Sequence, residues 1–144
     1  MTDLHGRVRQ MRLVVEVDDY DEALLFYRDV LGAAEELQIH SDLGEKVTIL
    51  DLGRATLELS NRAQVNMIDR VEVGRRVSPP LRVALEVDDA ASVTEELVAG
   101  GAELLAPPTR TPWESLNSRL EAPAGLQITL FEELGIPKDG DHDD

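Results

Sequence analysis

The sequence predicts an α+β fold built from two copies of one module, in which a strand and a helix are followed by further strands. The first observation is a repeat: the stretch RLVVEVDD at residues 12–19 returns as RVALEVDD at residues 82–89, shifted by 70 positions. The second is that each copy precedes a helix-like segment and then a Gly-Ala-Glu phrase, at residues 32–35 and 100–103. Such a long repeat indicates a duplicated structural unit.

Composition limits the classes of function. A chain of 144 residues suits one domain with a real core. Its 29 acidic residues outnumber 14 basic ones, and the net charge of −15 argues against a nucleic-acid partner, because phosphates are bound by clustered Lys and Arg. The chain has no cysteine, no signal-like N-terminus and no apolar run near the roughly 20 residues of a membrane span. We therefore expect a cytoplasmic protein without a membrane partner.

The repeated stretch itself predicts a strand followed by a helix cap. In residues 12–17 the aliphatic side chains alternate with Arg12, Val14 and Glu16, so that one face is wholly apolar and is expected to meet a helix. Asp18 and Asp19 are turn and cap residues, which accept hydrogen bonds from the first amides of a helix.

Residues 21–31 have helical spacing, and Gly32 ends the predicted helix. The helix carries an apolar stripe for which core packing is favoured over a pocket-lining role. The stripe consists of Ala23, Leu24, Phe26, Tyr27, Val30 and Leu31.

The remaining elements follow the same order in both halves. Polar residues, basic residues and Pro79-Pro80 mark a connection, with room for a short helix or strand. In the second half, Pro107-Pro108 predicts a bend before Trp113. The predicted organisation is a flexible N-terminus (1–10), module 1 (11–61), a linker (62–80), module 2 (81–133) and a disordered acidic tail (134–144). The strands expected in module 1 are residues 12–17, 36–40, 46–52 and 55–60. In module 2 we expect a helix at residues 90–99 and strands at 82–87, from 103, at 116–121 and at 126–132.

Two such modules, together with the phrase FYRDVLG at residues 26–32, resemble the vicinal oxygen chelate superfamily. This superfamily includes glyoxalase I, bleomycin-resistance proteins and extradiol dioxygenases. The resemblance covers about residues 11–132 and implies two βαβββ modules that form a curved eight-stranded mixed sheet, a cup with its helices outside and its ligand inside. The same fold serves enzymes and binding proteins, so the residues of the site must decide the function.

Metal-using members of this superfamily place a His on the first strand of each module and a Glu or an equivalent residue on its last strand. Counted from the helix starts, the His positions fall on Arg12 and Arg82, and the closing positions fall on Glu58 and Thr129. A guanidinium only donates hydrogen bonds and stays protonated, so it cannot replace a His ligand. We therefore expect no metal and no other cofactor.

The same positions become candidate ligand contacts. Arg12 and Glu58 are expected to be neighbours, either as a filler ion pair or as a ligand contact. Arg82 faces Thr129 rather than a carboxylate, and could pair with Glu16 or Glu86 or bind an anionic ligand.

Trp113 and Arg119 lie in a run that resembles the cup-lining stretch of bleomycin-resistance-type members. Trp113 could stack on a flat ligand or simply pack, and Arg119 could donate hydrogen bonds to a ligand. The histidines add little. His5 and His142 lie near the chain ends, and His40 is interpreted as a surface residue beside a turn.

The favoured hypothesis is a metal-independent small-molecule binding protein, for sequestration, resistance or sensing. The alternative is a lyase, isomerase or dioxygenase with displaced metal ligands, or with Glu58 as a weak candidate base, a role that the neighbouring Arg12 opposes by stabilising the carboxylate. A third possibility is an assembly module whose cup is filled by side chains. By analogy with the family we expect a homodimer, because a curved open sheet has edges to cover.

Overall fold

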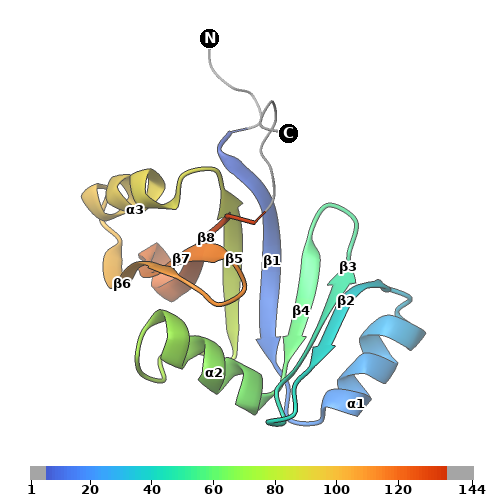
Figure 1. Cartoon of the computed structure of the whole chain (residues 1–144). Helices are drawn as coiled ribbons and strands as arrows, with labels where there is room; N and C mark the ends of the chain where they lie inside the picture. Colours follow the sequence, from blue (N-terminus) through green and yellow to red (C-terminus); the bar gives the residue numbers. More distant parts are fainter. Residues whose placement is uncertain (1–5, 136–144) are drawn as a thin grey trace.

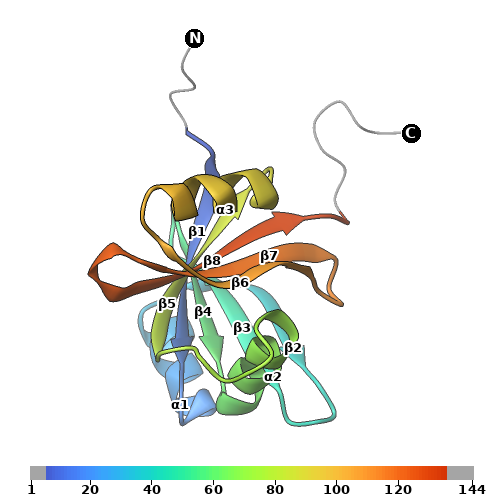
Figure 2. The ribbon, with the colours of Figure 1, turned by 90° about the vertical axis from the view of Figure 1, so that its left-hand side faces the viewer.

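The computed structural model describes residues 6–135, which form one open, strongly curved sheet with three helical segments around it (Figures 1 and 2). The predicted α+β fold of two βαβββ modules is confirmed. Module 1 contains β1 (Val8–Glu16), α1 (Tyr20–Leu24) with the π-helical turn η1 (Leu25–Val30), β2 (Ala34–His40), β3 (Lys46–Asp51) and β4 (Thr56–Ser60). Module 2 contains β5 (Leu81–Val87), α3 (Ala90–Ala99), β6 (Glu103–Arg110), β7 (Ser115–Ala122), the short 3-10 turn η2 (Pro123–Gly125) and β8 (Leu126–Glu133).

The strand order β2-β3-β4-β1-β5-β8-β7-β6 shows the duplication directly. In each module the first strand lies parallel to the last one, β1 to β4 and β5 to β8. The two modules join where β1 and β5 pair antiparallel in the centre of the sheet. The four central strands therefore bring the repeated stretches and both closing strands side by side (Figure 1).

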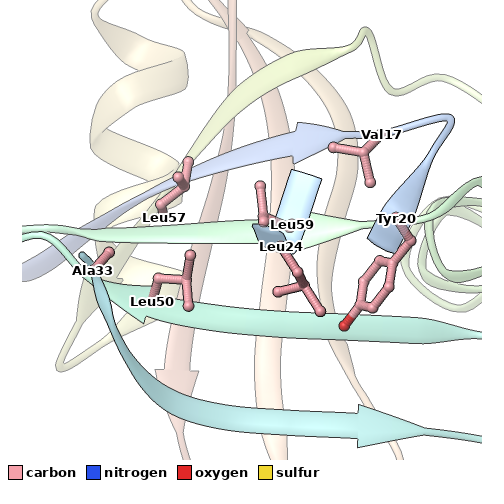
Figure 3. Packing of buried hydrophobic residues seen from close by; sticks show 7 residues of the cluster. All are labelled: Val17, Tyr20, Leu24, Ala33, Leu50, Leu57 and Leu59. Carbon is pink, nitrogen blue, oxygen red and sulfur yellow. The ribbon is translucent and has the colours of Figure 1, made fainter. Parts of the chain in front are cut away.

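The convex face of the sheet holds the two main apolar clusters, one for each module. In module 1, Tyr20 and Leu24 of α1 pack on Leu50, Leu57 and Leu59 (Figure 3). Leu13, Val15 and Val17 join this cluster, so the predicted alternation of the first strand is correct. In module 2, α3 packs in the same way on β7 and β8.

Both predicted helix caps are present. The side chain of Asp19 accepts a hydrogen bond from the amide of Glu22 at 3.0 Å, and Asp89 accepts one from the amide of Ser92 at 3.0 Å. These aspartates satisfy amides that the helices themselves leave unpaired.

The predicted apolar stripe of the first helix is wrong over its second half. Phe26, Val30 and Leu31 are exposed, and only the earlier residues and Tyr27 pack on the core. The reason is the π-helical turn, in which the amide of Leu31 bonds the carbonyl of Phe26, five residues earlier. Residues with α-helical spacing no longer share one face across such a turn.

Three other boundaries differ from the prediction. The first strand starts at Val8, so residues 8–10 belong to the sheet rather than to a flexible N-terminus. The predicted linker does contain a helix, α2 (Arg62–Glu72), capped by Asn61, and this helix of 11 residues takes up more than half of it. Strand β6 continues through Pro107 and Pro108, which an edge strand tolerates, and its register shifts there. Residues 1–5 and 136–144, which include His5, His142 and most of the predicted tail, lie outside the described residues.

None of the helices in residues 6–135 is long and apolar enough to cross a membrane.

Candidate ligand-binding site

A cavity of about 510 Å³ lies on the concave face of the sheet. Its floor is formed by the central strands β1, β4, β5 and β8, and one wall by the outer strands β2 and β3. The opposite side is formed by α2 and by the turn before β7. The residues that the repeat places on the concave face therefore meet at the bottom of a cavity large enough for a small organic molecule.

The four positions that were matched from the sequence to the metal ligands of the superfamily come together on this floor. Arg12, Glu58, Arg82 and Thr129 all line the cavity. Register explains this: Ala84 of β5 pairs with Arg12 on one side and with Thr129 on the other, and Val14 of β1 pairs in the same way with Arg82 and Glu58. Trp113 lines the rim and is 42% exposed, which leaves part of its indole accessible.

Arg12 is held between a carboxylate and an aromatic ring. Its Nη1 lies 3.9 Å from Oε1 of Glu58, so the two charges are neighbours but do not form a hydrogen bond at this distance. The guanidinium carbon lies 5.1 Å from the centre of the Phe131 ring, within the range of a cation–π contact. The other carboxylate oxygen of Glu58 accepts a hydrogen bond from Ser60 Oγ at 3.2 Å.

Arg82 has a different environment. Only 4% of the residue is exposed, and its Nη1 donates to Thr129 Oγ1 at 2.6 Å. Burial lowers the pKa of its guanidinium, and the positive charge of Arg119 lowers this pKa further. Glu16 and Glu86, the two partners considered from the sequence, bind other residues: Glu16 binds Arg76 and Arg62, and Glu86 accepts from Gln10.

Arg119 does not line the cavity, although the sequence suggested it as a ligand contact. It is completely buried beneath α2, where Nη1 donates to Asp69 at 3.0 Å and Nη2 donates to Glu72 at 2.7 Å. Nη1 also donates to Ser78 and Gln127, so both terminal nitrogens of the guanidinium are occupied by protein groups, while the buried Nε has no hydrogen-bond partner among the described residues.

Sequence reasoning missed Asp69 and Glu72, the acidic residues of α2. Asp69 accepts hydrogen bonds from the Val77 and Ser78 amides and from Ser78 Oγ. Burial alone would raise the pKa of its carboxyl, but these hydrogen bonds and the charge of Arg119 hold it below the ordinary value. The spacing of Val65, Ile68 and Glu72 after a capping Asn61 could have indicated a helix with one buried face.

The aliphatic wall was also missed. Leu37 and Ile39 of β2 and Val47 and Ile49 of β3 line the cavity with Met67 and Ile68 of α2. Their alternation along two predicted strands was the available signal, but the sequence alone did not assign that face to the cup.

Glu133 lies at the end of β8 and lines the cavity. Burial raises the pKa of its carboxyl, the negative charge of Glu86 raises it further, and Arg12 opposes both effects.

The residues of the floor do not fit the divalent metal that the resemblance implies. Two of the four corresponding positions are guanidinium groups, which have no lone pair to donate, and the third is a threonine bound to one of them. Within residues 6–135, no group of three or more His, Cys, Asp or Glu side chains is arranged to hold a metal ion.

Comparison with known proteins agrees with this architecture. The model of the glyoxalase/bleomycin resistance protein/dioxygenase superfamily matches residues 9–130. A hypothetical protein from Bacillus halodurans C-125 is 15% identical with a TM-score of 0.65, and the match covers 88% of this chain and 95% of that one. Methylmalonyl-CoA epimerase from Mycobacterium tuberculosis is 20% identical with a TM-score of 0.64, over 92% and 93% of the two chains.

The corresponding epimerase from Streptomyces coelicolor, solved as an S115T variant with 2-nitronate-propionyl-CoA, is 17% identical with a TM-score of 0.64, over 92% of this chain and 99% of that one. At these identities the structural likeness establishes the fold. A search of curated protein sequences gave no match.

Proposed function

Since this chain belongs to the glyoxalase/bleomycin resistance protein/dioxygenase superfamily, we propose that it binds a small molecule in the cup of its sheet without a metal ion. The observation that carries the proposal is the combination of an open cavity with a donor set that is unsuited to a divalent cation. Arg12 and Arg82 would repel a cation at the positions where metal-using members bind one. The cavity keeps the space and the apolar wall that a small organic ligand needs.

The biological role that fits such a protein is sequestration, resistance or sensing. Stacking between several aromatic rings is not the expected mode of binding. Among the residues that line the cavity, only Phe131 and Trp113 are aromatic, and Arg12 already covers the ring of Phe131. Shape, aliphatic contact and the buried polar floor are the features that a ligand would use.

The first test is metal analysis of the purified protein together with a ligand screen. We expect no stoichiometric zinc, nickel, iron or manganese after dialysis, and we expect thermal-shift hits from a library of small organic molecules. Stoichiometric metal that survives dialysis would overturn the proposal. A screen without hits would favour the alternative that the cup serves only assembly.

A pair of tryptophan substitutions would show whether hits bind in the cavity. Ile39→Trp places a bulky ring in the cavity from a half-exposed position on β2 and is expected to abolish binding. Val98→Trp adds the same ring on α3, outside the cavity, and should leave binding unchanged. Equal binding by both variants would exclude the cup as the site.

One observation keeps an enzymatic alternative open. Glu58 is buried, lines the cavity and has a carboxylate oxygen that accepts from Ser60, so a metal-free lyase or isomerase could use it as a base. Turnover of a bound compound by the natural protein, lost in Glu58→Gln while the compound still binds, would establish that role. Binding without turnover would support the simpler function.

We also propose that two chains form a homodimer. Strand β2 is an edge strand with every residue exposed, and apolar residues of η1 are exposed nearby in module 1. Sedimentation velocity of the purified chain should give the mass of a dimer, and a monomer at micromolar concentration would contradict this proposal.

A further inference from the structure

Arg82 is a buried cation that faces the cavity and has little contact with protein acceptors. Among the described residues its one hydrogen-bond acceptor is Thr129 Oγ1, and no carboxylate oxygen lies within 4.0 Å of its guanidinium nitrogens. A guanidinium carries five N–H groups in a planar fork. Most of these donors are therefore available to a molecule in the cavity.

The other two arginines of the concave face have acidic neighbours. Arg119 forms two ion pairs, at 3.0 Å with Asp69 and at 2.7 Å with Glu72. Arg12 lies 3.9 Å from Glu58 and against the ring of Phe131. Arg82 differs from both, because its neighbour on the closing strand is a neutral hydroxyl.

The carboxylates around Arg82 are already engaged elsewhere. Glu72 accepts from Arg119 at 2.7 Å and from Asn117 at 2.6 Å. Glu58 accepts from Ser60 and lies beside Arg12. Neither carboxylate contacts Arg82, so the protein offers it distant negative charge but no bound counter-ion.

Burial of a charge without a bound counter-ion costs far more than burial of an apolar side chain of similar size. The lowered pKa of Arg82, caused mainly by burial and then by Arg119, has the same physical meaning. An anionic group supplied by a ligand would offset this cost. The binding energy would be largest for a planar anion that matches the two-pronged fork.

Resting on the small-molecule binding proposed above, we infer that the ligand carries one carboxylate group, which binds Arg82 on the cavity floor beside Thr129. A single charge fits better than a phosphate dianion. Of the two arginines that line the cavity, only Arg82 is without a contacting acid, and the carboxylates of Glu58 on the floor and Glu72 on α2 would repel a second negative charge. A ligand ammonium group would meet the positive charge of Arg82 directly.

The rest of the ligand is expected to be apolar. The wall above the floor consists of Leu37, Ile39, Val47 and Ile49, with Met67 on the side of α2. Such a wall rewards aliphatic or aromatic surface and offers few hydrogen bonds. The ligand class is therefore a small carboxylic acid with an aliphatic or aryl body.

Four probes with one hydrocarbon body separate the possible headgroups: hexanoate, hexanamide, hexylamine and hexyl phosphate. Titration of the isotopically labelled protein, followed by NMR, gives a Kd for each. We expect hexanoate to bind at least tenfold more tightly than hexanamide and hexylamine, because a charge-assisted pair with Arg82 is worth at least this factor. Hexyl phosphate should also bind more weakly than hexanoate, because Glu58 and Glu72 repel its second negative charge. Tighter binding of hexyl phosphate or of hexylamine would overturn the inference.

Two variants test the role of Arg82 itself. Arg82→Met keeps the bulk of the side chain and should weaken hexanoate at least tenfold, with little effect on hexanamide. Thr129→Val removes the hydroxyl that orients the guanidinium, keeps the shape, and should weaken hexanoate severalfold. It also provides a test if Arg82→Met does not fold.

Arg70→Met is the matched control, since Arg70 is an exposed residue of α2 that does not line the cavity. This variant loses the same charge and should bind hexanoate normally. Equal binding of hexanoate and hexanamide, unchanged by Arg82→Met, would overturn the inference that the ligand carries a carboxylate. The proposal that the cavity binds a small molecule would still stand. Failure of these probes and of every library compound would overturn the binding function as well.

Discussion

Arg12 and Arg82 occupy the same position in the two copies of one repeat, yet their surroundings differ in almost every respect. Arg12 keeps 22% of its side chain exposed, next to Glu58 and over Phe131. Arg82 is buried and bonds only Thr129 among the described residues. The residue on the closing strand, Glu58 in one module and Thr129 in the other, therefore decides whether the arginine has an acidic neighbour.

The modules also use their concave faces differently. Module 1 presents an aliphatic wall to the cavity, from Leu37 on β2 to Ile49 on β3. In module 2, α2 covers part of the concave face through the buried ion pairs of Arg119. The duplicated sheet has thus become an asymmetric cup, with an apolar side for a ligand body and a polar side that holds α2 in place.

The largest effect on stability is expected at Arg119. Arg119→Met leaves the carboxylates of Asp69 and Glu72 buried without their main cation. Removal of one partner of a buried ion pair costs about 3–5 kcal/mol, and we expect a loss of this size in the free energy of unfolding. Urea denaturation measures it.

Arg76→Met is the control for this variant. Arg76 also binds Asp69, at 3.4 Å, but its side chain is 39% exposed. Surface ion pairs contribute about 0–1 kcal/mol, so the loss should be correspondingly small. Equal losses for the two variants would show that the network does not depend on the buried guanidinium.

Asp69→Asn should lose about 2–3 kcal/mol at neutral pH, because several hydrogen bonds to a charged acceptor are weakened together. The sign of the pH dependence follows from the lowered pKa. A carboxyl whose pKa is lower in the folded state stabilises the fold above the ordinary value of 3.8, and this contribution disappears as the pH falls through the folded pKa. The difference between natural protein and variant should therefore shrink below about pH 4.

A constant difference between pH 7 and pH 3 would mean that the Asp69 charge contributes nothing and that only shape matters. Urea denaturation at a series of pH values separates the two cases.

Arg82→Met should leave stability unchanged or raise it by about 1 kcal/mol, in contrast to Arg119→Met. The guanidinium of Arg82 has a lowered pKa, which means that its charge is less favourable in the folded state than in the unfolded chain. The apolar, shorter side chain of methionine removes that cost, although Thr129 loses a hydrogen bond. A stable variant that no longer binds carboxylates would separate a binding residue from a structural one.

Loss of more than about 3 kcal/mol in Arg82→Met would contradict this distinction. Thermal unfolding monitored by circular dichroism, with Arg70→Met beside it, is sufficient for the comparison.

The fold was largely predictable from the sequence because the repeat fixed both modules and the strand alternation fixed their faces. Leu13 and Val15 are on the convex face and Arg12 is on the concave face, as their period of two requires. The positions of Glu58 and Thr129 followed from their places on the closing strands.

The errors have local physical causes. A π-helical turn places Phe26 and Val30 outside the core, and the spacing of apolar residues does not predict such a turn. The burial of Arg119 depends on α2, whose Asp69 and Glu72 are distant from it in the sequence. Charged residues are normally assigned to the surface or to a ligand, so an internal ion pair between distant segments is invisible without the fold.

The smallest effect on stability is expected at Glu133, which tests how far the charge of Arg12 acts along the floor of the cavity. Burial and the charge of Glu86 raise the pKa of its carboxyl above the ordinary 4.5. The ionised form is thus disfavoured in the folded state, and its cost appears as the pH rises above that value. Glu133→Gln should stabilise the protein at pH 7 by less than about 1 kcal/mol, because the group keeps contact with solvent.

Below pH 4 the natural carboxyl is already protonated, and the advantage of Glu133→Gln should vanish. Arg12 opposes the raised pKa, so in an Arg12→Met background the gain at pH 7 should increase. Thermal unfolding of the four proteins of this double-mutant cycle at pH 4 and pH 7 measures the coupling. If Glu133→Gln stabilises the protein equally with and without Arg12, then the guanidinium of Arg12 interacts with Glu58 and Phe131 but not with Glu133.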